Sequence, residues 1–245
     1  MKITGNTVLI TGGATGIGFA LARAFVKKNN RVIVCGRQER KLEEAKARLP
    51  QVETKPCDVS SPRGRRDLWK WAVSKFKDLN VLINNAGIQR QIDFRQGASD
   101  LVSGESEIAV NFEAPVHLSA LFIPHLSRQP EAAIINVTSG LAFAPLAIVP
   151  VYCATKAALH SFTLSLRHQL LDTSIKVFEV APPIVDTGLD KGAREERQQK
   201  DRGITPEEAA KATLEGMTKD QFEIVIGLAS NLRLNPEKMF EMMNR

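Results

Sequence analysis

Three polar side chains in the second half of the chain have the types and spacing needed for acid/base chemistry at a carbonyl or a secondary alcohol. Tyr152 and Lys156 stand four residues apart in a segment of helical character, which places them on one helix face. An ammonium group beside a phenol favours the phenolate by Coulomb attraction, so the phenol can exchange protons as an acid/base catalyst. Ser139 follows an apolar run, and its hydroxyl could hold the reacting oxygen. Taken singly, each residue also fits an ordinary structural role.

A glycine-rich turn near the start of the chain could bind the phosphates of a dinucleotide. Residues 11–18 read TGGATGIG, directly after the first apolar run and before a segment of helical period. Gly12, Gly16 and Gly18 would allow a tight turn, close approach of the backbone to a pyrophosphate, and close packing of helix on strand. A glycine-rich turn that binds no ligand is the alternative. No Gly-Lys-Ser/Thr follows, which disfavours hydrolysis of nucleotide triphosphates.

The residues after the second and third apolar runs bear on which dinucleotide would bind. At the end of the second run, Gly36 offers no carboxylate to a ribose 2′-hydroxyl, whereas the guanidinium of Arg37 suits a 2′-phosphate. This favours NADP(H) over NAD(H). Asp58, after the third run, is in a position to contact the adenine. The alternatives are that Arg37 is a solvated residue of the next helix and that Asp58 is a carboxylate near a helix N-terminus.

An alternation of short apolar runs and helical segments indicates the fold that would bring these groups together. Apolar residues three and four apart mark helices in 17–25 and in 68–76. Strands that are apolar at successive positions are buried on both faces, which predicts an α/β fold with a doubly wound, Rossmann-type parallel sheet and helices on both faces. The predicted strands are 7–11, 31–35, 52–57, 81–83, 132–137, 175–180 and 222–226, so the sheet is expected to be seven-stranded.

No linker and no internal repeat divides the chain, so residues 1–245 are expected to form a single NAD(P)-binding domain. The long polar interval after the sixth strand predicts a substrate loop near residues 188–204. The tail over 236–245 has helical character.

Composition and charge are those of an average soluble domain, with 43% hydrophobic and 24% charged residues. The net charge of +6 comes from short basic clusters interleaved with acids, so no nucleic-acid partner is expected. No apolar run reaches the length of a membrane span. The three cysteines lack metal-ligand spacing and fit reduced core residues of a cytoplasmic protein. The four histidines lack an i, i+4 pair, which favours packed or surface roles, and no metal is expected.

Taken together, the motifs resemble those of the short-chain dehydrogenase/reductase family, in the family's order and spacing, from the first strand to about residue 190. They are Thr11-Gly12-x-x-x-Gly16-x-Gly18, Asn84-Asn85-Ala86-Gly87, Ser139 and Tyr152-x-x-x-Lys156. The resemblance implies hydride transfer between a nicotinamide cofactor and a small-molecule carbonyl or secondary alcohol. It makes Tyr152 the general acid/base and Ser139 the residue that positions the reacting oxygen. Lys156 would assist the tyrosine and bind the nicotinamide ribose.

Asn111 matches the fourth catalytic residue of the family, whose backbone carbonyl holds a water that relays protons to the lysine. The sequence offers a physical reason, because Pro115 lies four residues further on and has no N–H to donate to that carbonyl. If the stretch is helical, the Asn111 carbonyl lacks its α-helical donor. The alternative is that Pro115 only kinks a helix or marks its start.

The resemblance also implies a set of cofactor contacts, with NADP(H) preferred and NAD(H) possible. After the sixth strand, Pro183 stands where the family usually has glycine, whereas Val185 and Thr187 match the residues near the carboxamide. The implied contacts are Gly12, Thr15, Gly16, Ile17, Gly18, Arg37, Asp58, Val59, Asn85, Ala86, Gly87, Tyr152, Lys156, Val185 and Thr187.

A narrower resemblance is to the DltE-type oxidoreductases of bacteria, over 84–94, 114–126, 137–147 and 150–170. The family implies a homodimer or homotetramer that uses the helices beginning near Gly104 and Tyr152. A 3-oxoacyl-carrier-protein reductase and a nicotinamide-binding regulator without turnover are the alternative functions. The intact Ser139, Tyr152 and Lys156 set argues against the regulator. The apolar run 141–146 could line a substrate pocket, or belong to the core or to a subunit interface.

Overall fold

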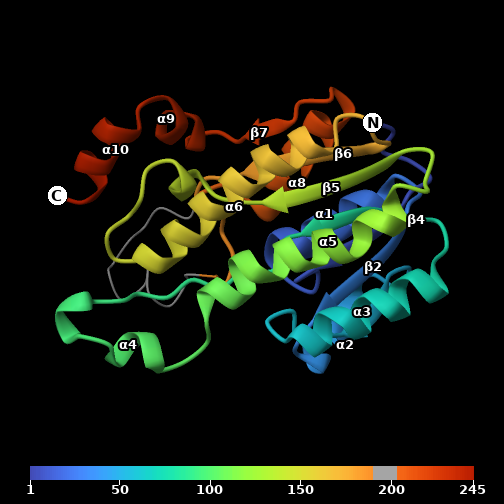
Figure 1. Ribbon diagram of the computed structural model, residues 1–245, viewed down its shortest axis with the longest axis horizontal. Coiled ribbons are helices and arrows are strands. Elements are labelled where there is room, and N and C mark those ends of the chain that lie inside the picture. The colour runs from blue at the N-terminus through green and yellow to red at the C-terminus, as the bar shows by residue number, and fades with distance from the viewer. Residues whose placement is uncertain (190–202) are drawn as a thin grey trace.

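Seven parallel strands form one sheet in the order β3-β2-β1-β4-β5-β6-β7 (Figure 1). The computed structural model describes residues 1–189 and 203–245. The sheet confirms the predicted fold class, and each predicted strand is present with ends within two residues of those expected. The strands are β1 (Thr7–Thr11), β2 (Arg31–Gly36), β3 (Glu53–Pro56), β4 (Leu79–Asn84), β5 (Ala132–Val137), β6 (Ile175–Ala181) and β7 (Glu223–Val225).

Helices connect the strands, and several of them begin where the sequence supplies a capping side chain or a proline in the first turn. The side chain of Ser61 caps the helix that starts at Pro62, and Thr205 forms a capping box with Glu208. The helices are α1 (Gly16–Lys27), α2 (Glu39–Arg48), α3 (Pro62–Lys75), α4 (Ser99–Val102), α5 (Ala114–Leu126), α6 (Pro150–Gln169), α8 (Pro206–Thr218), α9 (Ala229–Leu234) and α10 (Pro236–Met243). Short helical turns are η1 (Phe94–Gln96), η2 (Ala109–Glu113) and η3 (Gly140–Ala142).

Two hydrophobic cores lie on the two faces of the sheet. Side chains alternate along each strand, so Val8 and Ile10 face α1, α2 and α8, whereas Leu9 faces α3, α5 and α6. In Figure 1, α3, α5 and α6 cross the face of the sheet that is turned toward the viewer. This double cover explains why the strands are apolar at successive positions.

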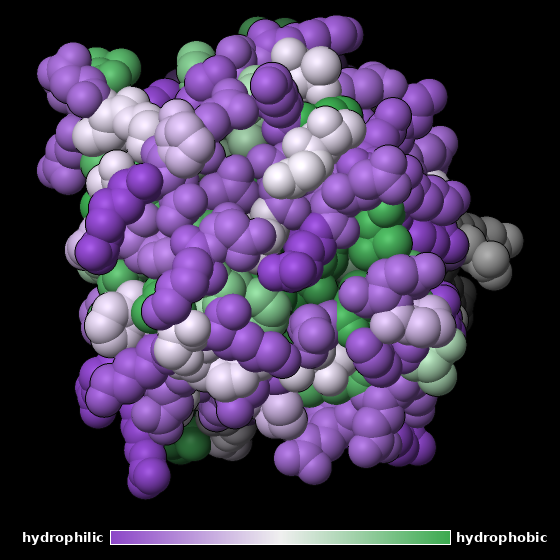
Figure 2. Space-filling model, turned by 90° about the vertical axis from the view of Figure 1, so that its right-hand side faces the viewer, coloured by the Kyte–Doolittle hydropathy of each residue, from purple (hydrophilic) through white to green (hydrophobic). Residues whose placement is uncertain are grey.

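The strand order reverses between β1 and β4, and open α/β sheets bind ligands at such a point, beyond the carboxyl ends of the strands. These ends lie on the left in Figure 1, where α9 and α10 pass above the edge and the segment with α4 passes below it. Figure 2 shows the opposite end of the molecule, where hydrophilic side chains cover most of the surface. We therefore expect the ligand site at the carboxyl edge of the sheet.

Most of the substrate loop predicted near 188–204 lies outside the described residues. The segments that flank it meet in a parallel bridge between Val185 and Ile204. Among the described helices, none is long and apolar enough to cross a membrane.

Candidate active site

A large cavity of about 1270 Å³ opens at the carboxyl edge of the sheet. It exceeds the range of roughly 300–1,000 Å³ that is usual for small-molecule sites, so a dinucleotide and a substrate could share it. Of the catalytic and cofactor residues predicted from the sequence, all line the cavity except Gly18 and Asn111, which are buried just behind its wall. The predicted residues that line it are Gly12, Thr15, Gly16, Ile17, Arg37, Asp58, Val59, Asn85, Ala86, Gly87, Ser139, Tyr152, Lys156, Val185 and Thr187.

The glycine turn packs so closely that side chains are excluded from two of its positions. Gly12 has a φ of +63°, and a Cβ on it would lie 2.9 Å from the Cα of Ala86. A Cβ on Gly18 would lie 2.3 Å from the carbonyl oxygen of Gly12. The turn thus brings the first turn of α1 against the end of β1, and the helix N-terminus faces the cavity.

Asn85 fastens the segment after β4 to this turn. Its Nδ2 donates to the carbonyl oxygens of Thr11 and Gly12 at 2.9 and 3.2 Å. The Thr11 hydroxyl in turn accepts hydrogen bonds from the backbone N–H groups of Asn85 and Ala86, both at 3.0 Å. The sequence motif that suggested a cofactor contact therefore also locks β1 to the chain after β4.

An ion pair crosses one end of the cavity. Arg37, just after β2, approaches Glu105 with 2.5 Å between Nη1 and Oε1, and both residues line the cavity. This contact raises the pKa of the guanidinium above its usual value. Lys41 and Asp58 line the same end of the cavity. Sequence reasoning identified Arg37 and Asp58 but not Glu105, which belongs to a loop with no periodic pattern.

Arg90 holds the loop that presents Glu105. Its guanidinium donates to the carbonyl oxygens of Asp100, Ser103 and Glu105. Gly104 has a φ of +94°, and a Cβ there would lie 3.4 Å from that guanidinium. The loop is therefore wrapped around the guanidinium of the half-buried Arg90, which fixes the position of the backbone at Glu105.

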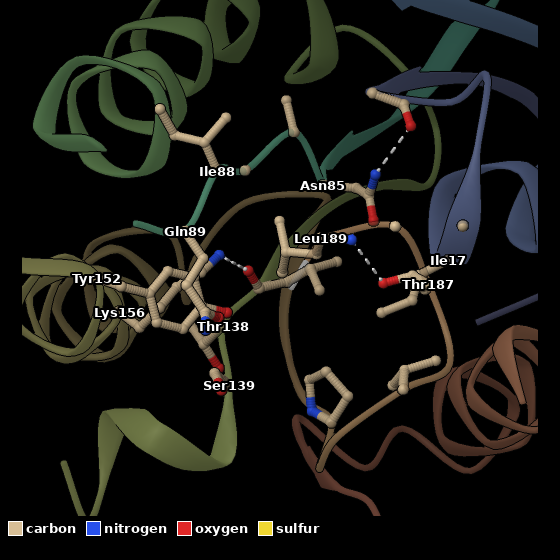
Figure 3. Close-up of a pocket in the computed structure, with 18 of the residues that line it drawn as sticks. Ile17, Asn85, Ile88, Gln89, Thr138, Ser139, Tyr152, Lys156, Thr187 and Leu189 are labelled. Carbon is tan, nitrogen blue, oxygen red and sulfur yellow. Dashed lines mark hydrogen bonds between the residues drawn. The ribbon is translucent and has the colours of Figure 1, made fainter. Parts of the chain in front are cut away.

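Tyr152 and Lys156 lie one turn apart on α6 and point into the cavity beside Ser139 (Figure 3). Lys156 is 4% exposed, and its Nζ donates to the carbonyl oxygen of Val137 at 2.8 Å. The Nζ lies 5.6 Å from the centroid of the Tyr152 ring. Burial lowers the pKa of Lys156 from 10.5 to about 8. Lys156 therefore lies beside the phenol of Tyr152 and can be either a charged ammonium or a neutral amine at a pH close to 8.

Ser139 begins the η3 turn at the end of β5. Its Oγ accepts a hydrogen bond from the Leu141 N–H at 3.1 Å. The Gly140 N–H donates to the Pro182 carbonyl at 2.9 Å, which ties this turn to the end of β6. A Cβ on Gly140 would lie 2.7 Å from Leu232, so the turn also packs closely on α9. The serine hydroxyl is thus presented to the cavity by a turn held on two sides.

Asn111 lies in η2, a π-helical turn that leads into α5. The helix continues through Pro115, whose nitrogen has no hydrogen to give, but η2 has π-helical hydrogen bonds from residue i+5 in place of the α-helical bonds from residue i+4. Pro115 also lies in the first turn of α5, as the alternative expected, so a free Asn111 carbonyl stays a prediction. The side chain accepts from the Ile88 N–H at 2.9 Å and donates to the Ile88 carbonyl at 2.8 Å and to Thr155 Oγ1 at 3.2 Å. It joins the chain after β4 to the helix that carries Tyr152.

Thr187 closes the cavity on the side of the glycine turn. A Cβ on Gly16 would lie 3.1 Å from the Thr187 methyl group, and the Thr187 hydroxyl accepts from the Leu189 N–H at 3.3 Å. Figure 3 shows Thr187 and Ile17 across the cavity from Tyr152. Pro183, which departs from the family pattern, lies in the cavity wall before Val185.

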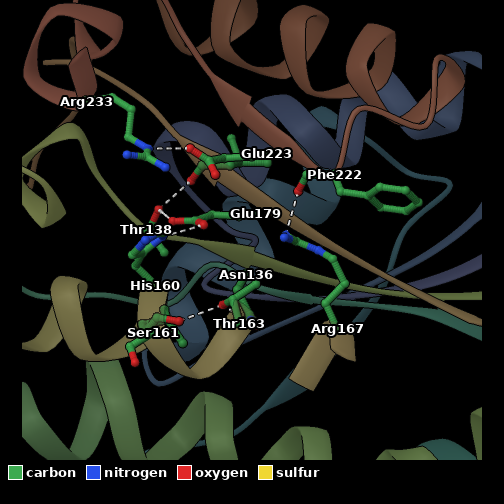
Figure 4. Close-up of polar contacts among 12 residues, drawn as sticks. Asn136, Thr138, His160, Ser161, Thr163, Arg167, Glu179, Phe222, Glu223 and Arg233 are labelled. Atoms are coloured by element: carbon green, nitrogen blue, oxygen red, sulfur yellow. Dashed lines mark hydrogen bonds and ion pairs between the residues drawn. The ribbon is translucent and has the colours of Figure 1, made fainter. Parts of the chain in front are cut away.

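A buried polar cluster supports the end of β5 behind Ser139 (Figure 4). Glu179 is fully buried on β6, where its carboxylate accepts from the Thr138 hydroxyl at 2.7 Å and pairs with His160 Nδ1 at 2.8 Å. The hydrogen bond to Glu179 raises the pKa of His160. The Phe143 ring packs edge-on against His160. The Arg233 guanidinium lies over this Phe143 ring, 5.1 Å from its centroid. No pattern in the sequence indicated this cluster.

Two of the other histidines have ordinary structural contacts. His117 Nδ1 lies 2.9 Å from a guanidinium nitrogen of Arg65, and His125 Nε2 lies 3.0 Å from the Leu79 carbonyl. Within the part of the chain that the structure describes, no three histidine, cysteine, aspartate or glutamate side chains form a metal-binding group.

The far end of the cavity, beyond Ser139, is lined by residues that sequence reasoning missed. The segment that holds α9 and α10 contributes Leu228, just before α9, and Asn231, Leu232, Met239 and Met243. Leu141 and Leu146, from the apolar run that was one candidate for a substrate pocket, face them. The helical character of residues 236–245 indicated a helix but not what it would cover.

Comparison with known proteins bears on the family of the chain. Residues 6–198 match the family model described as short chain dehydrogenase. The chain is 54% identical over 248 residues to "Uncharacterized oxidoreductase DltE" of Bacillus subtilis, covering 100% of this chain and 98% of that protein. It is 29% identical to the uncharacterized oxidoreductase SERP2049 of Staphylococcus epidermidis, covering 78% of this chain and 83% of the other.

Solved structures share the fold over nearly the whole chain. A short-chain dehydrogenase from Burkholderia cenocepacia in complex with NADP aligns with a TM-score of 0.83 and 26% identity, covering 99% of each chain. A short-chain dehydrogenase/reductase from Burkholderia phymatum in complex with NAD aligns with a TM-score of 0.85 and 22% identity, covering 100% of this chain and 97% of that one. The chain therefore belongs to the short-chain dehydrogenase/reductase family, a family of oxidoreductases.

Proposed function

We propose that this protein is an NADP(H)-dependent oxidoreductase that transfers a hydride between nicotinamide and a small carbonyl or secondary alcohol, with Ser139, Tyr152, Lys156 and Asn111 as its acid/base site. The observation that carries the proposal is the convergence of a buried lysine, a tyrosine and a serine at the wall of one cavity that begins at a glycine turn. A packed structural lysine would not need a tyrosine ring and a strand-end serine beside it.

The walls of the cavity fit a dinucleotide. Gly12 and Gly18 leave no room for side chains at the turn, so backbone N–H groups at the start of α1 are the surface that a pyrophosphate would meet. A Cβ on Gly87 would lie 3.4 Å from Asn111 Oδ1 and 3.6 Å from Lys156 Nζ, so this glycine keeps the approach to the lysine open. Asp58 and Val59 line the end where an adenine would lie.

The preference for NADP(H) rests on the cations near the end of β2. Arg37 and Lys41 line the cavity there, and Gly36 supplies no carboxylate to a ribose hydroxyl. Arg37 is engaged by Glu105, so a 2′-phosphate would have to displace a carboxylate to reach the guanidinium. The structure of Burkholderia cenocepacia with NADP gives a precedent in a related protein.

The roles of the side chains follow from where they lie. In the reducing direction, the Ser139 hydroxyl donates a hydrogen bond to the substrate carbonyl oxygen, and the Tyr152 hydroxyl gives that oxygen its proton. The Lys156 ammonium stabilises the phenolate that forms, and water held at the Asn111 carbonyl returns a proton to this pair. The bound nicotinamide supplies the hydride. Thr138, held by Glu179, keeps the end of β5 in place for Ser139.

A homodimer or homotetramer is part of the proposal. Phe94 is 56% exposed and Ile108 is 52% exposed beside an apolar hollow of about 410 Å³ at the start of α6. Such a surface is typical of a subunit contact. Cys35, Cys57 and Cys153 are all free and buried, which supports a location in the reducing cytoplasm. Sedimentation as a monomer at micromolar concentration would count against the oligomer.

The test is a screen of ketones and aldehydes that follows NADPH absorbance, with Tyr152→Phe as the matched variant. The variant keeps the ring and loses the proton that is transferred, so turnover should fall by at least a hundredfold while the NADPH Kd stays within a few-fold. Full activity in Tyr152→Phe would refute the mechanism. Arg37→Asp should shift the preference toward NAD(H), and an unchanged ratio of NADPH to NADH affinity would refute the phosphate role of Arg37.

A further inference from the structure

The end of the cavity beyond Ser139 differs in chemistry from the rest of it. Six apolar side chains line it, which are Leu141, Leu146, Leu228, Leu232, Met239 and Met243. Asn231 is the polar side chain among them. The charged residues that line the cavity elsewhere are Arg37, Lys41, Asp58, Arg90, Glu105 and Lys156, of which only Lys156 belongs to the catalytic group. Within the described residues, the wall beyond Ser139 therefore carries no charge.

The C-terminal segment from 227 to 245 forms most of this wall. Leu232 of α9 packs on the η3 turn, where a Cβ on Gly140 would lie 2.7 Å from it, so α9 sits directly against the turn that presents Ser139. Met239 and Met243 stand four residues apart on α10, which places both on the helix face toward the cavity. Met242, on another face of the same helix, is 59% exposed and does not line the cavity.

Asn244 fastens the free end of this segment to the loop after Ser139. Its Oδ1 accepts from the Ala147 N–H at 2.6 Å, and its Nδ2 donates to the Pro145 carbonyl at 3.1 Å. At the other end, Arg233 of α9 pairs with Glu223 of β7 at 2.7 Å. The two helices are therefore tied down on both sides of the apolar wall, which makes that wall a built part of the site.

An ionised group has a high free-energy cost in an apolar environment when it has no partner, whereas each methylene group gains from being buried. Methionine side chains adapt to ligands of different shape, so two of them suit a flexible alkyl chain. From these walls we infer that the substrates are uncharged carbonyl compounds, or the matching alcohols, that carry an alkyl or aryl chain beside the reacting carbon. The chain lies between η3 and the α9–α10 segment. This inference rests on the proposed function and names its substrate class.

The first experiment measures kcat/KM with NADPH for the methyl ketones from 2-butanone to 2-octanone, and for 7-oxooctanoate, which has the length of 2-octanone and ends in a carboxylate. Each added methylene group that is buried should raise kcat/KM by about fourfold. 7-Oxooctanoate should be at least tenfold poorer than 2-octanone. A flat series, or equal use of the charged ketone, would overturn the inference.

Three variants test whether the effect of chain length comes from the C-terminal segment. Met243→Asp puts a carboxylate into the wall, and Met242→Asp makes the same change on the exposed face of α10. Met243→Asp should lower the ratio of kcat/KM for 2-octanone to that for 2-butanone by at least tenfold, while Met242→Asp leaves the ratio unchanged. Leu228→Asp provides a second wall variant, because Leu228 is 68% exposed and a polar residue there does not threaten folding. Equal ratios in all three variants would overturn the inference.

Binding without turnover separates this inference from the proposed function. Isothermal titration calorimetry measures the Kd of the same ketones for the protein with NADP⁺ bound, a complex in which the ketone cannot be reduced. If affinity follows chain length and Met243→Asp reduces it, yet NADPH is not oxidised with any ketone, the apolar site stands and the hydride-transfer function fails. If ketones are reduced at rates independent of length and charge, the function stands and the inference fails. If 2-octanone neither binds nor reacts, the inference is refuted.

Discussion

Replacing Glu105 by glutamine should tighten the binding of NADPH and leave the binding of NADH unchanged. The Glu105 carboxylate pairs with Arg37 at the end of the cavity where a 2′-phosphate would lie. NADPH must break this pair or bring its phosphate close to the carboxylate, and both cost free energy. NADH has a neutral ribose hydroxyl at that position and needs no access to the guanidinium. Glutamine keeps the shape of the side chain and removes the charge.

The size of the effect follows from how exposed the pair is. The side chains of Arg37 and Glu105 are 38% and 51% exposed, so solvent and salt screen their attraction. Ion pairs of this kind contribute about 0.2–1 kcal/mol, which corresponds to a decrease in the NADPH Kd of about 1.4- to 5-fold in Glu105→Gln. The effect should shrink as the salt concentration rises.

Fluorescence titration of NADPH and NADH at low and high salt measures both affinities. Glu44→Gln is the matched control, because it removes the same charge from an exposed pair with Arg40 on α2 without touching the cavity wall. An NADPH Kd that does not change in Glu105→Gln, or an equal gain for NADH, would refute the displacement of Glu105. A similar gain in Glu44→Gln would show that only the net charge of the protein matters.

Three further predictions concern the interior of the site. The hydrogen bond to Glu179 raises the pKa of His160, so its stabilising effect is full below the usual value of about 6.5 and is lost as the pH rises through the raised pKa. His160→Gln should therefore lower the melting temperature more at pH 6 than at pH 9, and an equal loss at both would contradict this. Because burial lowers the pKa of Lys156 to about 8, kcat/KM for carbonyl reduction should fall above that pH, and a profile flat to pH 10 would be inconsistent with an ammonium role. A Cβ on Gly18 would lie 2.3 Å from a carbonyl oxygen of the turn, so Gly18→Ala should cost about 1–3 kcal/mol in unfolding free energy and abolish NADPH binding, whereas Gly188→Ala, with nothing within 4 Å, should not.

The sheet could be predicted because its signal is local. A run such as Ile10 and its neighbours in β1 is buried on both faces, and burial on both faces leaves an apolar stretch in the sequence that needs no partner to be seen. The ends of a strand differ from the predicted ends where pairing with a neighbouring strand determines them. β4 begins at Leu79, two residues before the predicted start, because Leu79 pairs with Thr7 across an irregular register. Such pairing is a property of two strands and is not visible in either one.

The candidate site also has a part that could be predicted from local sequence patterns and a part that could not. The positions of Ser139, Tyr152 and Lys156 followed from fixed spacing on one strand end and one helix, and the structure brings them to one cavity. The contact between Glu105 and Arg37 joins residues 68 positions apart through a loop wrapped around a guanidinium. No periodicity marks such a loop, so sequence reasoning could name Arg37 as a phosphate ligand but not the carboxylate that competes for it.

The proposed recognition of the cofactor and that of the substrate depend on different kinds of contact. In the proposed function, cofactor choice would depend on exposed charges around Arg37, each of which can be changed by one substitution at little cost to folding. In the inference drawn above, substrate choice would depend on a segment that follows the last strand. Leu232 attaches this segment to Gly140, and Asn244 attaches it to the loop at 145–147. A helical tail was predictable from its pattern, but its place over Ser139 depends on a glycine that leaves room for a leucine 92 residues away. In the proposed function, Ser139, Tyr152 and Lys156 act on the carbonyl alone, so within the described residues this tail would set which chain beside the carbonyl the cavity accepts.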